Sequence, residues 1–260
     1  MRVLAVYSIK GGVGKTATAV NLAYLSARAG ARTLIWDLDP QAATTFYFRV
    51  APKVSGGIRK LVRGKRAIDR LIRGTDYDGL DLLPADFSYR NLDLELDATR
   101  KPRSRLAKRI RPLRRRYDHL YIDCAPNISL ASEGIFEAAD ALLVPIIPTT
   151  LSQRSLRQLL GHLDQQGPKR LSVLPFFCMV DRRKSLHRQI CAADGGGSVR
   201  YLAARIPYSS EVERMGARRA PLATYAPACE AAQAYEALWR EVLGHTGSWL
   251  GWFRTDRFGF

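Results

Sequence analysis

Residues 10–16 read KGGVGKT, a segment that combines three glycines with two lysines and a threonine. A glycine-rich turn between a strand and a helix lets backbone N–H groups converge on phosphate oxygens, and the positive end of the helix dipole adds to the attraction. Lys15 can reach the β- and γ-phosphates, and the Thr16 hydroxyl can bind Mg²⁺. Rather than a glycine turn with a solvated lysine, we expect a nucleotide site made by Lys10, Gly11, Gly12, Val13, Gly14, Lys15, Thr16 and Ala17.

Acidic residues end two of the apolar, strand-like runs. Asp37 and Asp39 lie in WDLDPQ at 36–41, and Asp123 follows DHLYI. Carboxylates at the C-terminal ends of strands face the ligand crevice of an open α/β sheet. Asp123 resembles the Walker B carboxylate that holds Mg²⁺ through water. The alternative for Asp37 and Asp39 is a strand end with two solvated acids.

The elements that must position these residues alternate along the chain. A strand at 2–8, a helix at 15–29 and a strand at 32–39 form a βαβ unit, which requires a parallel sheet. Further strands are expected at 79–84, 118–123, 141–147, 171–180 and 203–207, with helices between them, notably at 151–166 and 229–243. This order predicts an α/β fold, a doubly wound and mostly parallel sheet with helices on both faces. We expect one domain over 1–244 and an aromatic, basic tail over 245–260.

Charge is the unusual feature of the composition. The 260 residues include 41 Lys and Arg against 24 Asp and Glu, for a net charge of +17. Such a surface attracts polyanions, nucleic acid first and anionic lipid second, although charge can also serve solubility alone. The four cysteines and four histidines form no metal-ligand pattern, and no apolar run is long enough to span a bilayer. These features indicate a reduced, cytoplasmic location.

The loop and the first acidic segment together resemble the ParA/MinD family of P-loop ATPases. The strict pattern GxxxxGK[ST] fails because Ile9 replaces its first glycine, but the deviant Walker A pattern KGGxGK[ST] and the motif DxDPQ both fit. The resemblance implies a P-loop NTPase of the deviant Walker A type, with ATP and Mg²⁺ as cofactors and a homodimer in the ATP-bound state. It assigns catalytic roles to three residues: Lys10 would reach the partner's phosphates and neutralise charge with Lys15, and Asp39 would place the attacking water. It implies a metal group of Thr16, Asp37, Asp39 and Asp123.

The resemblance extends over nearly all of residues 1–244. It implies that Asp181 and Pro207 lie near the adenine. Ala17 departs from the family, which usually has a second hydroxyl there, and its loss removes a hydrogen bond worth about 1 kcal/mol. Cys124 fits a buried spacer after Asp123 better than a nucleophile, and it is the only cysteine near these motifs, which disfavours an iron–sulfur role.

Basic clusters are the second functional signal. Family ParA proteins bind DNA without sequence preference through basic residues late in the chain, which implies contacts by Arg182, Arg183, Lys184, Arg188, Arg214, Arg218 and Arg219. A further run at 100–116 holds ten Lys or Arg and no acid. It either binds DNA or docks a partner, unless it is one more solvated helix face.

We expect an ATP-dependent dimeric switch, associated with the nucleoid, that positions or segregates a plasmid, a chromosome or a protein assembly. A ParB-like or cargo-adaptor protein would stimulate its slow ATP hydrolysis. One alternative is a MinD-like ATPase that cycles on membrane through the tail at 248–260, SWLGWFRTDRFGF, although this tail could instead pack on the domain or dock a protein. Another is a constitutive basic DNA-binding protein with a structural nucleotide.

Overall fold

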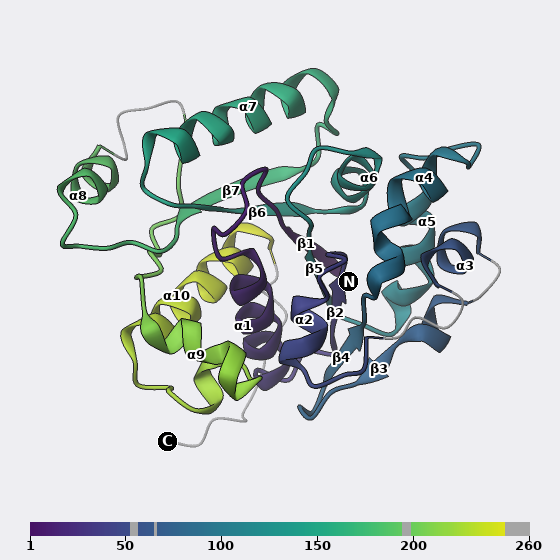
Figure 1. Ribbon diagram of the computed structural model, residues 1–260, viewed down its shortest axis with the longest axis horizontal. Helices are drawn as coiled ribbons and strands as arrows, with labels where there is room; N and C mark the ends of the chain where they lie inside the picture. The colour runs from purple at the N-terminus through teal and green to yellow at the C-terminus, as the bar shows by residue number, and fades with distance from the viewer. Residues whose placement is uncertain (53–56, 65–66, 194–198, 248–260) are drawn as a thin grey trace.

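The computed structural model describes residues 1–52, 57–64, 67–193 and 199–247 of the chain (Figure 1). Its centre is one seven-stranded sheet with the order β3-β4-β2-β5-β1-β6-β7. All neighbouring strands run parallel except β3 and β4. The strands are β1 Arg2–Val6, β2 Thr33–Asp37, β3 Arg73–Gly74, β4 Leu80–Leu83, β5 His119–Asp123, β6 Ala141–Ile146 and β7 Ser172–Phe177.

Helices fill the connections between the strands. The α-helices are α1 Lys15–Arg28, α2 Ala43–Tyr47, α3 Gly57–Arg63, α4 Leu92–Asp97, α5 Arg105–Ile110, α6 Leu130–Ala138, α7 Thr150–Gln166, α8 Ser185–Ala192, α9 Ser210–Arg218 and α10 Glu230–His245. The described residues also form four 3₁₀ turns: η1 Ile68–Leu71, η2 Phe87–Asn91, η3 Arg111–Arg115 and η4 Leu222–Thr224. The helices expected at 15–29, 151–166 and 229–243 are confirmed as α1, α7 and α10.

The sheet is buried on both faces. Val3 and Ala5 of β1 pack on one face and Leu4 and Val6 on the other, and all four are fully buried. Helices α3 to α7 contribute to the first core, whereas α1, α9 and α10 contribute to the second. A parallel sheet covered on both sides needs strands that are mainly apolar, as the central strands are between their ends. The predicted doubly wound architecture is therefore confirmed.

Two strand predictions differ from the structure. The segment 203–207 is not a strand but forms a single parallel bridge between Pro207 and Val180. The Leu202 N–H donates to the Pro175 carbonyl, and the Ile206 N–H donates to the Phe177 carbonyl. These two bonds are four residues apart on one side but only two residues apart on β7, so the regular hydrogen-bond ladder of a parallel strand pair cannot form. The two-residue antiparallel strand β3 was not predicted.

The division into a domain over 1–244 and a tail over 245–260 stays a prediction. Helix α10 ends at His245, and Thr246 is buried with its hydroxyl donating to the Val242 carbonyl. The aromatic segment at 248–260 lies outside the described residues, so its role stays a prediction. No helix in the described part of the chain is long and apolar enough to cross a bilayer.

Candidate nucleotide site

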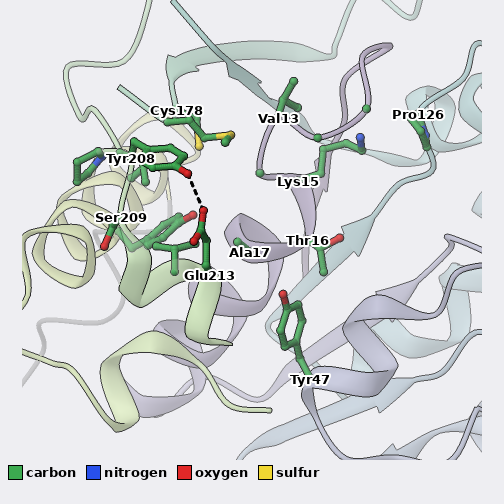
Figure 2. Close-up of a pocket in the computed structure, with 18 of the residues that line it drawn as sticks. Val13, Lys15, Thr16, Ala17, Tyr47, Pro126, Cys178, Tyr208, Ser209 and Glu213 are labelled. Atoms are coloured by element: carbon green, nitrogen blue, oxygen red, sulfur yellow. Dashed lines mark hydrogen bonds between the residues drawn. The ribbon is translucent and has the colours of Figure 1, made fainter. Parts of the chain in front are cut away.

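The glycine loop connects the end of β1 to the start of α1, at the C-terminal edge of the central strands. Gly12 and Gly14 have left-handed backbone angles, with φ of 69° and 94°, and Gly14 is the N-cap of α1. A Cβ on Gly14 would lie 2.8 Å from the Cys178 Sγ, just beyond β7, so the loop approaches this strand end closely. The loop forms the floor of a cavity of about 350 Å³ (Figure 2).

The cavity contains most of the residues that the sequence assigns to phosphate binding. Residues 11–17 and Asp39 line it. Beyond these, its walls come from the ends of other elements: Tyr47, Pro126, Cys178, Met179, Ile206, Pro207, Tyr208, Ser209, Val212, Glu213 and Tyr235. The expected contribution of Pro207 is therefore consistent with the geometry.

The two lysines of the loop point to different places. Lys15 is 7% exposed and lines the cavity, where its Nζ donates to the Lys10 carbonyl at 3.2 Å. Burial lowers the pKa of Lys15, and the negative charges of Asp123 and Asp39 raise it by a smaller amount. Lys10 does not line the cavity; its Nζ donates instead to the Ser152 hydroxyl of α7 at 3.4 Å. Lys15 is thus positioned for the nucleotide of its own chain and Lys10 is not.

Two buried carboxylates lie opposite each other beneath the cavity. Asp37 of β2 and Asp123 of β5 are partners in register and are both fully buried. Desolvation raises the pKa of both, and the charge of Asp123 raises that of Asp37 further. Neither residue is in the lining, although Asp39, two positions after Asp37, is.

The Asp37 carboxylate is occupied by protein donors. It accepts hydrogen bonds from the backbone N–H and hydroxyl of Thr45, both at 2.8 Å, and from the Asp39 N–H at 3.1 Å. These contacts fix the start of α2 and the turn that carries Asp39. The predicted place of Asp37 in the metal shell is untested, and the structure gives it a positioning role.

Asp123 differs in how its two oxygens are occupied. Its Oδ2 accepts from the Thr44 hydroxyl at 2.8 Å, whereas its buried Oδ1 makes no hydrogen bond of ordinary length in the described structure, although the Thr16 hydroxyl lies close enough to lower the Asp123 pKa. A buried carboxylate oxygen of this kind fits a cation or a cation-bound water. No three His, Cys, Asp or Glu side chains converge on a metal site within the described residues. Mg²⁺ suits this arrangement, because it is commonly held by one or two protein oxygens together with substrate phosphates and water.

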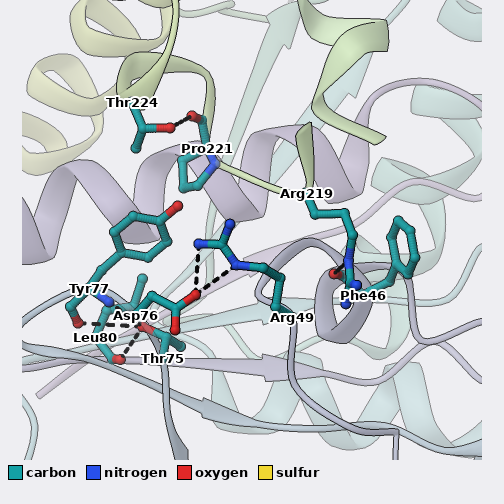
Figure 3. A network of polar contacts seen from close by, with 9 residues as sticks. All are labelled: Phe46, Arg49, Thr75, Asp76, Tyr77, Leu80, Arg219, Pro221 and Thr224. Atoms are coloured by element: carbon teal, nitrogen blue, oxygen red, sulfur yellow. Dashed lines mark hydrogen bonds and ion pairs between the residues drawn. The ribbon is translucent and has the colours of Figure 1, made fainter. Parts of the chain in front are cut away.

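Helix α2 is also held from its outer side (Figure 3). The Arg219 Nε donates to the Phe46 carbonyl at 3.0 Å, and its guanidinium lies over the Phe46 ring at 4.4 Å. Arg49, just after α2, pairs with Asp76 at 2.7 Å. The helix that carries Thr44, Thr45 and Tyr47 is therefore fixed by the buried acids on one side and by two arginines on the other.

The far wall of the cavity was only partly predicted. Tyr208 donates its hydroxyl to the Glu213 carboxylate at 2.7 Å, and Tyr47 faces them from α2 across the opening (Figure 2). No motif marks Tyr47, whereas Tyr208 and Glu213 belong to the segment 204–227, which resembles the family's segment near the adenine but from which only Pro207 was singled out. The predicted Asp181 is not in the lining: its carboxylate accepts from the Arg183 backbone and side chain, which lowers its pKa to about 2.

The residues predicted to contact DNA lie around α8 and α9, which occupy the same side of the molecule (Figure 1). Several are engaged within the chain. Arg182 pairs with Glu230, Arg183 with Asp181 and Arg214 with Glu211, and the Arg218 guanidinium lies over the Tyr225 ring. The Arg182 and Arg183 side chains are nonetheless 80% and 85% exposed. Exposed ion pairs of this kind are worth little, so a phosphate can replace the acid.

Comparisons with known proteins agree with this geometry. A family model described as an AAA domain matches residues 1–170. The chromosome partitioning protein ParA of Caulobacter vibrioides strain NA1000 is 30% identical over 253 residues, which cover 94% of each chain.

Solved structures show the same fold. A plasmid partition protein of Borrelia burgdorferi aligns with a TM-score of 0.78 at 20% identity, over 94% of this chain and 98% of that one. Cobyrinic acid a,c-diamide synthase of Mycobacterium smegmatis, with bound ATP analogue and magnesium, aligns with a TM-score of 0.80 at 24% identity over the full length of both chains.

Proposed function

This chain belongs to the ParA/MinD family of P-loop ATPases, and from that premise we propose that it is an ATP-dependent dimeric switch that binds DNA without sequence preference. Its cargo would be a plasmid, a chromosome or a protein assembly, and a ParB-like or adaptor protein would stimulate hydrolysis. The observation that carries the proposal is the divergence of the two loop lysines. The Lys15 side chain faces the cavity of its own chain, whereas the Lys10 side chain lies outside the cavity and contacts Ser152 of α7.

A homodimer gives Lys10 a function that the monomer does not. The Lys10–Ser152 contact is a long hydrogen bond of 3.4 Å, so a stronger partner can displace it. A triphosphate in the facing cavity of a second copy is such a partner, because its negative charges add a Coulomb attraction to the Lys10 ammonium that the uncharged Ser152 hydroxyl cannot supply. Dimer formation would then depend on the nucleotide, since only a phosphate across the interface attracts Lys10.

The chain's own residues account for hydrolysis. Lys15 binds the β- and γ-phosphates, and Lys10 from the partner adds a second cation where negative charge develops. Asp39 faces the cavity and positions the attacking water, while its Oδ1 is steadied by the Gln41 N–H at 2.9 Å. The Thr16 hydroxyl and Asp123 Oδ1 would hold Mg²⁺, which when bound neutralises charge on the phosphates. The resulting site binds and orients its substrate well but has no strong base, which suits slow basal turnover.

DNA binding would use the cations around α8 and α9, which are exposed except for the half-buried Arg219: Arg182, Arg183, Lys184, Arg188, Arg214, Arg218 and Arg219. Phosphate contacts release counterions, so affinity should fall with salt at a log–log slope of about −0.9 per phosphate contacted. Arg219 is the exception in this group, because its guanidinium is held against Phe46. We therefore expect it to contribute more to the position of α2 than to DNA affinity.

Retention on random-sequence duplex DNA tests the proposal. Wild type, Lys10→Ala and the control Lys169→Ala, an exposed lysine after α7, are compared without nucleotide, with ADP and with ATP, across a salt series. The proposal predicts salt-sensitive binding that is much tighter with ATP than with ADP or without nucleotide, a gain that is lost in Lys10→Ala and kept in the control. Equal binding in every nucleotide state would contradict it and favour a constitutive basic DNA-binding protein.

A further inference from the structure

A second cavity lies far from the nucleotide site, beside α4 and α5. Its volume is about 390 Å³, and it is lined by one threonine and four cations: Thr99, Arg100, Lys101, Arg105 and Lys108. Figure 1 places α4 and α5 at the side of the molecule opposite α8 and α9. We refer to it as the α5 cavity.

The walls of the α5 cavity are held by the protein core. Leu106 and Ile110 of α5 are buried in the first core, so the helix presents its remaining side chains outward. The Thr99 hydroxyl donates to the Leu96 carbonyl at 2.7 Å, and the Arg105 Nε donates to the Val62 carbonyl. The cations are therefore displayed on an ordered frame rather than on an unattached loop.

Two acids of the neighbouring helices, Glu95 of α4 and Glu133 of α6, are engaged elsewhere. Glu95 pairs with Arg59 and Arg63, and Glu133 pairs with Arg103. No acid is among the residues that line the cavity. The four cations thus face a shared space whose described lining holds no carboxylate, an arrangement that attracts anions.

A fifth cation, Arg109, lies beside Arg105 but outside the lining. Arg109 packs over Gly64, and its buried Nε has no hydrogen-bond partner among the described residues. Burial and the neighbouring charge of Arg105 both lower the pKa of Arg109. Like charges brought together at the cost of solvation are typical of a site that binds an anion.

The size and charge of the cavity define the class of anion. Its volume falls in the range of ligand pockets, about 300–1,000 Å³, so it is not limited to a single small ion. Four positive side chains around one cavity match a ligand that carries several negative charges better than a ligand with a single carboxylate. Arginine forks and lysine ammonium groups are the usual partners of phosphate.

The surface beyond the cavity is also basic. Arg111, Arg114, Arg115 and Arg116 are all exposed and follow α5 directly. We infer that the α5 cavity is a phosphate-binding site, separate from the nucleotide site, and that the extended basic surface beside it lets it take a phosphate of a nucleic-acid backbone. This goes beyond the proposed switch, because the site needs neither ATP nor a second copy of the chain.

The test removes three of the four positive charges that line the cavity and keeps the hydrogen bonds of Thr99 and Arg105 that hold its walls. The variant Arg100→Gln/Lys101→Gln/Lys108→Gln changes three exposed cations and keeps Arg105, which is bonded to Val62. The control Arg157→Gln/Lys169→Gln/Arg200→Gln removes the same charge from exposed positions elsewhere. Both are compared with wild type while ADP saturates the nucleotide cavity. The probes are inorganic tripolyphosphate and a random-sequence duplex.

We expect the cavity variant to bind tripolyphosphate at least about tenfold more weakly than wild type, and the control to change by less than about twofold. A parallel loss of duplex binding, with a salt slope shallower by about 2–3, identifies the source as nucleic acid. Loss of tripolyphosphate alone identifies a free oligophosphate. Equal behaviour of the two variants with both probes overturns the inference. ATP turnover and the urea midpoint, measured in parallel, must match wild type. Failure of the ATP switch would not affect this result, which is obtained in the ADP state.

Discussion

The three glycines of the nucleotide loop should respond differently to the same substitution. Gly11 has ordinary backbone angles and open space where a Cβ would lie. Gly12 has open space but a φ of +69°, and Gly14 combines a φ of +94° with the Cys178 Sγ at 2.8 Å. Alanine is therefore expected to cause no strain at position 11 and backbone strain at position 12. At position 14 it is expected to cause backbone strain together with a steric clash.

The expected costs follow from these differences. Gly11→Ala should change the free energy of unfolding by less than about 1 kcal/mol, and in the stabilising direction, because alanine restricts the unfolded chain. Gly12→Ala should cost about 1–2 kcal/mol for a left-handed residue with a Cβ. Gly14→Ala should cost about 2–5 kcal/mol, since overpacking adds about 1–3 kcal/mol. Cys178 cannot easily give way, because it is 1% exposed at the end of β7.

Urea unfolding of the nucleotide-free protein measures the series. Adding Cys178→Ala to Gly14→Ala should recover the steric part of the loss and leave the backbone part. The reasoning is refuted if Gly14→Ala costs no more than Gly12→Ala, or if the second substitution recovers nothing. Either outcome would mean that the loop does not approach β7 as closely as the structure shows.

Three other predictions concern stability and affinity. Thr45→Val should lower the free energy of unfolding by about 2–4 kcal/mol in urea, because it removes a donor to Asp37 and the acceptor of the buried Ala85 N–H. Thr44→Val, which loses one hydrogen bond, should cost less. Ala17→Thr should strengthen ATP binding about fivefold in calorimetry, by restoring one hydrogen bond. Burial lowers the pKa of His119 from 6.5 to about 4, so the unfolded chain binds the extra proton between these pH values. The free energy of unfolding should then fall by about 3 kcal/mol as pH drops from 6.5 to 4, a loss that His119→Gln removes.

The sequence was sufficient for the parts of the site that depend on local chemistry. The loop at 10–16 and the carboxylates at strand ends follow from residue type and spacing, because a strand, a glycine turn and a helix fix each other's geometry over a few residues. The central strands were also predictable, since a sheet buried on both faces needs runs that are mainly apolar.

The remaining parts depend on contacts between distant segments. Tyr47 and Glu213 reach the cavity only because α2 and α9 pack near the loop, and no local signal singles out either of them. Asp181 was predicted to lie near the adenine of the nucleotide, but its carboxylate accepts hydrogen bonds from the neighbouring Arg183 side chain. Strand β3 has two residues, too few to produce a periodic pattern. The α5 cavity combines charges that the sequence showed as one run without indicating which of them converge.

The central position of β1 affects how the chain folds during synthesis. β1 is made first, but its two neighbours are β5 and β6, whose paired residues lie at 119–123 and 141–143. Until the ribosome has released residues 119–143, Leu4 and Val6 lack one or both of their neighbouring strands and remain available to other chains. A nascent chain of this protein therefore carries an unpaired apolar edge for much of its translation. Fragments that end before Ala141 should aggregate rather than fold, whatever their nucleotide motifs.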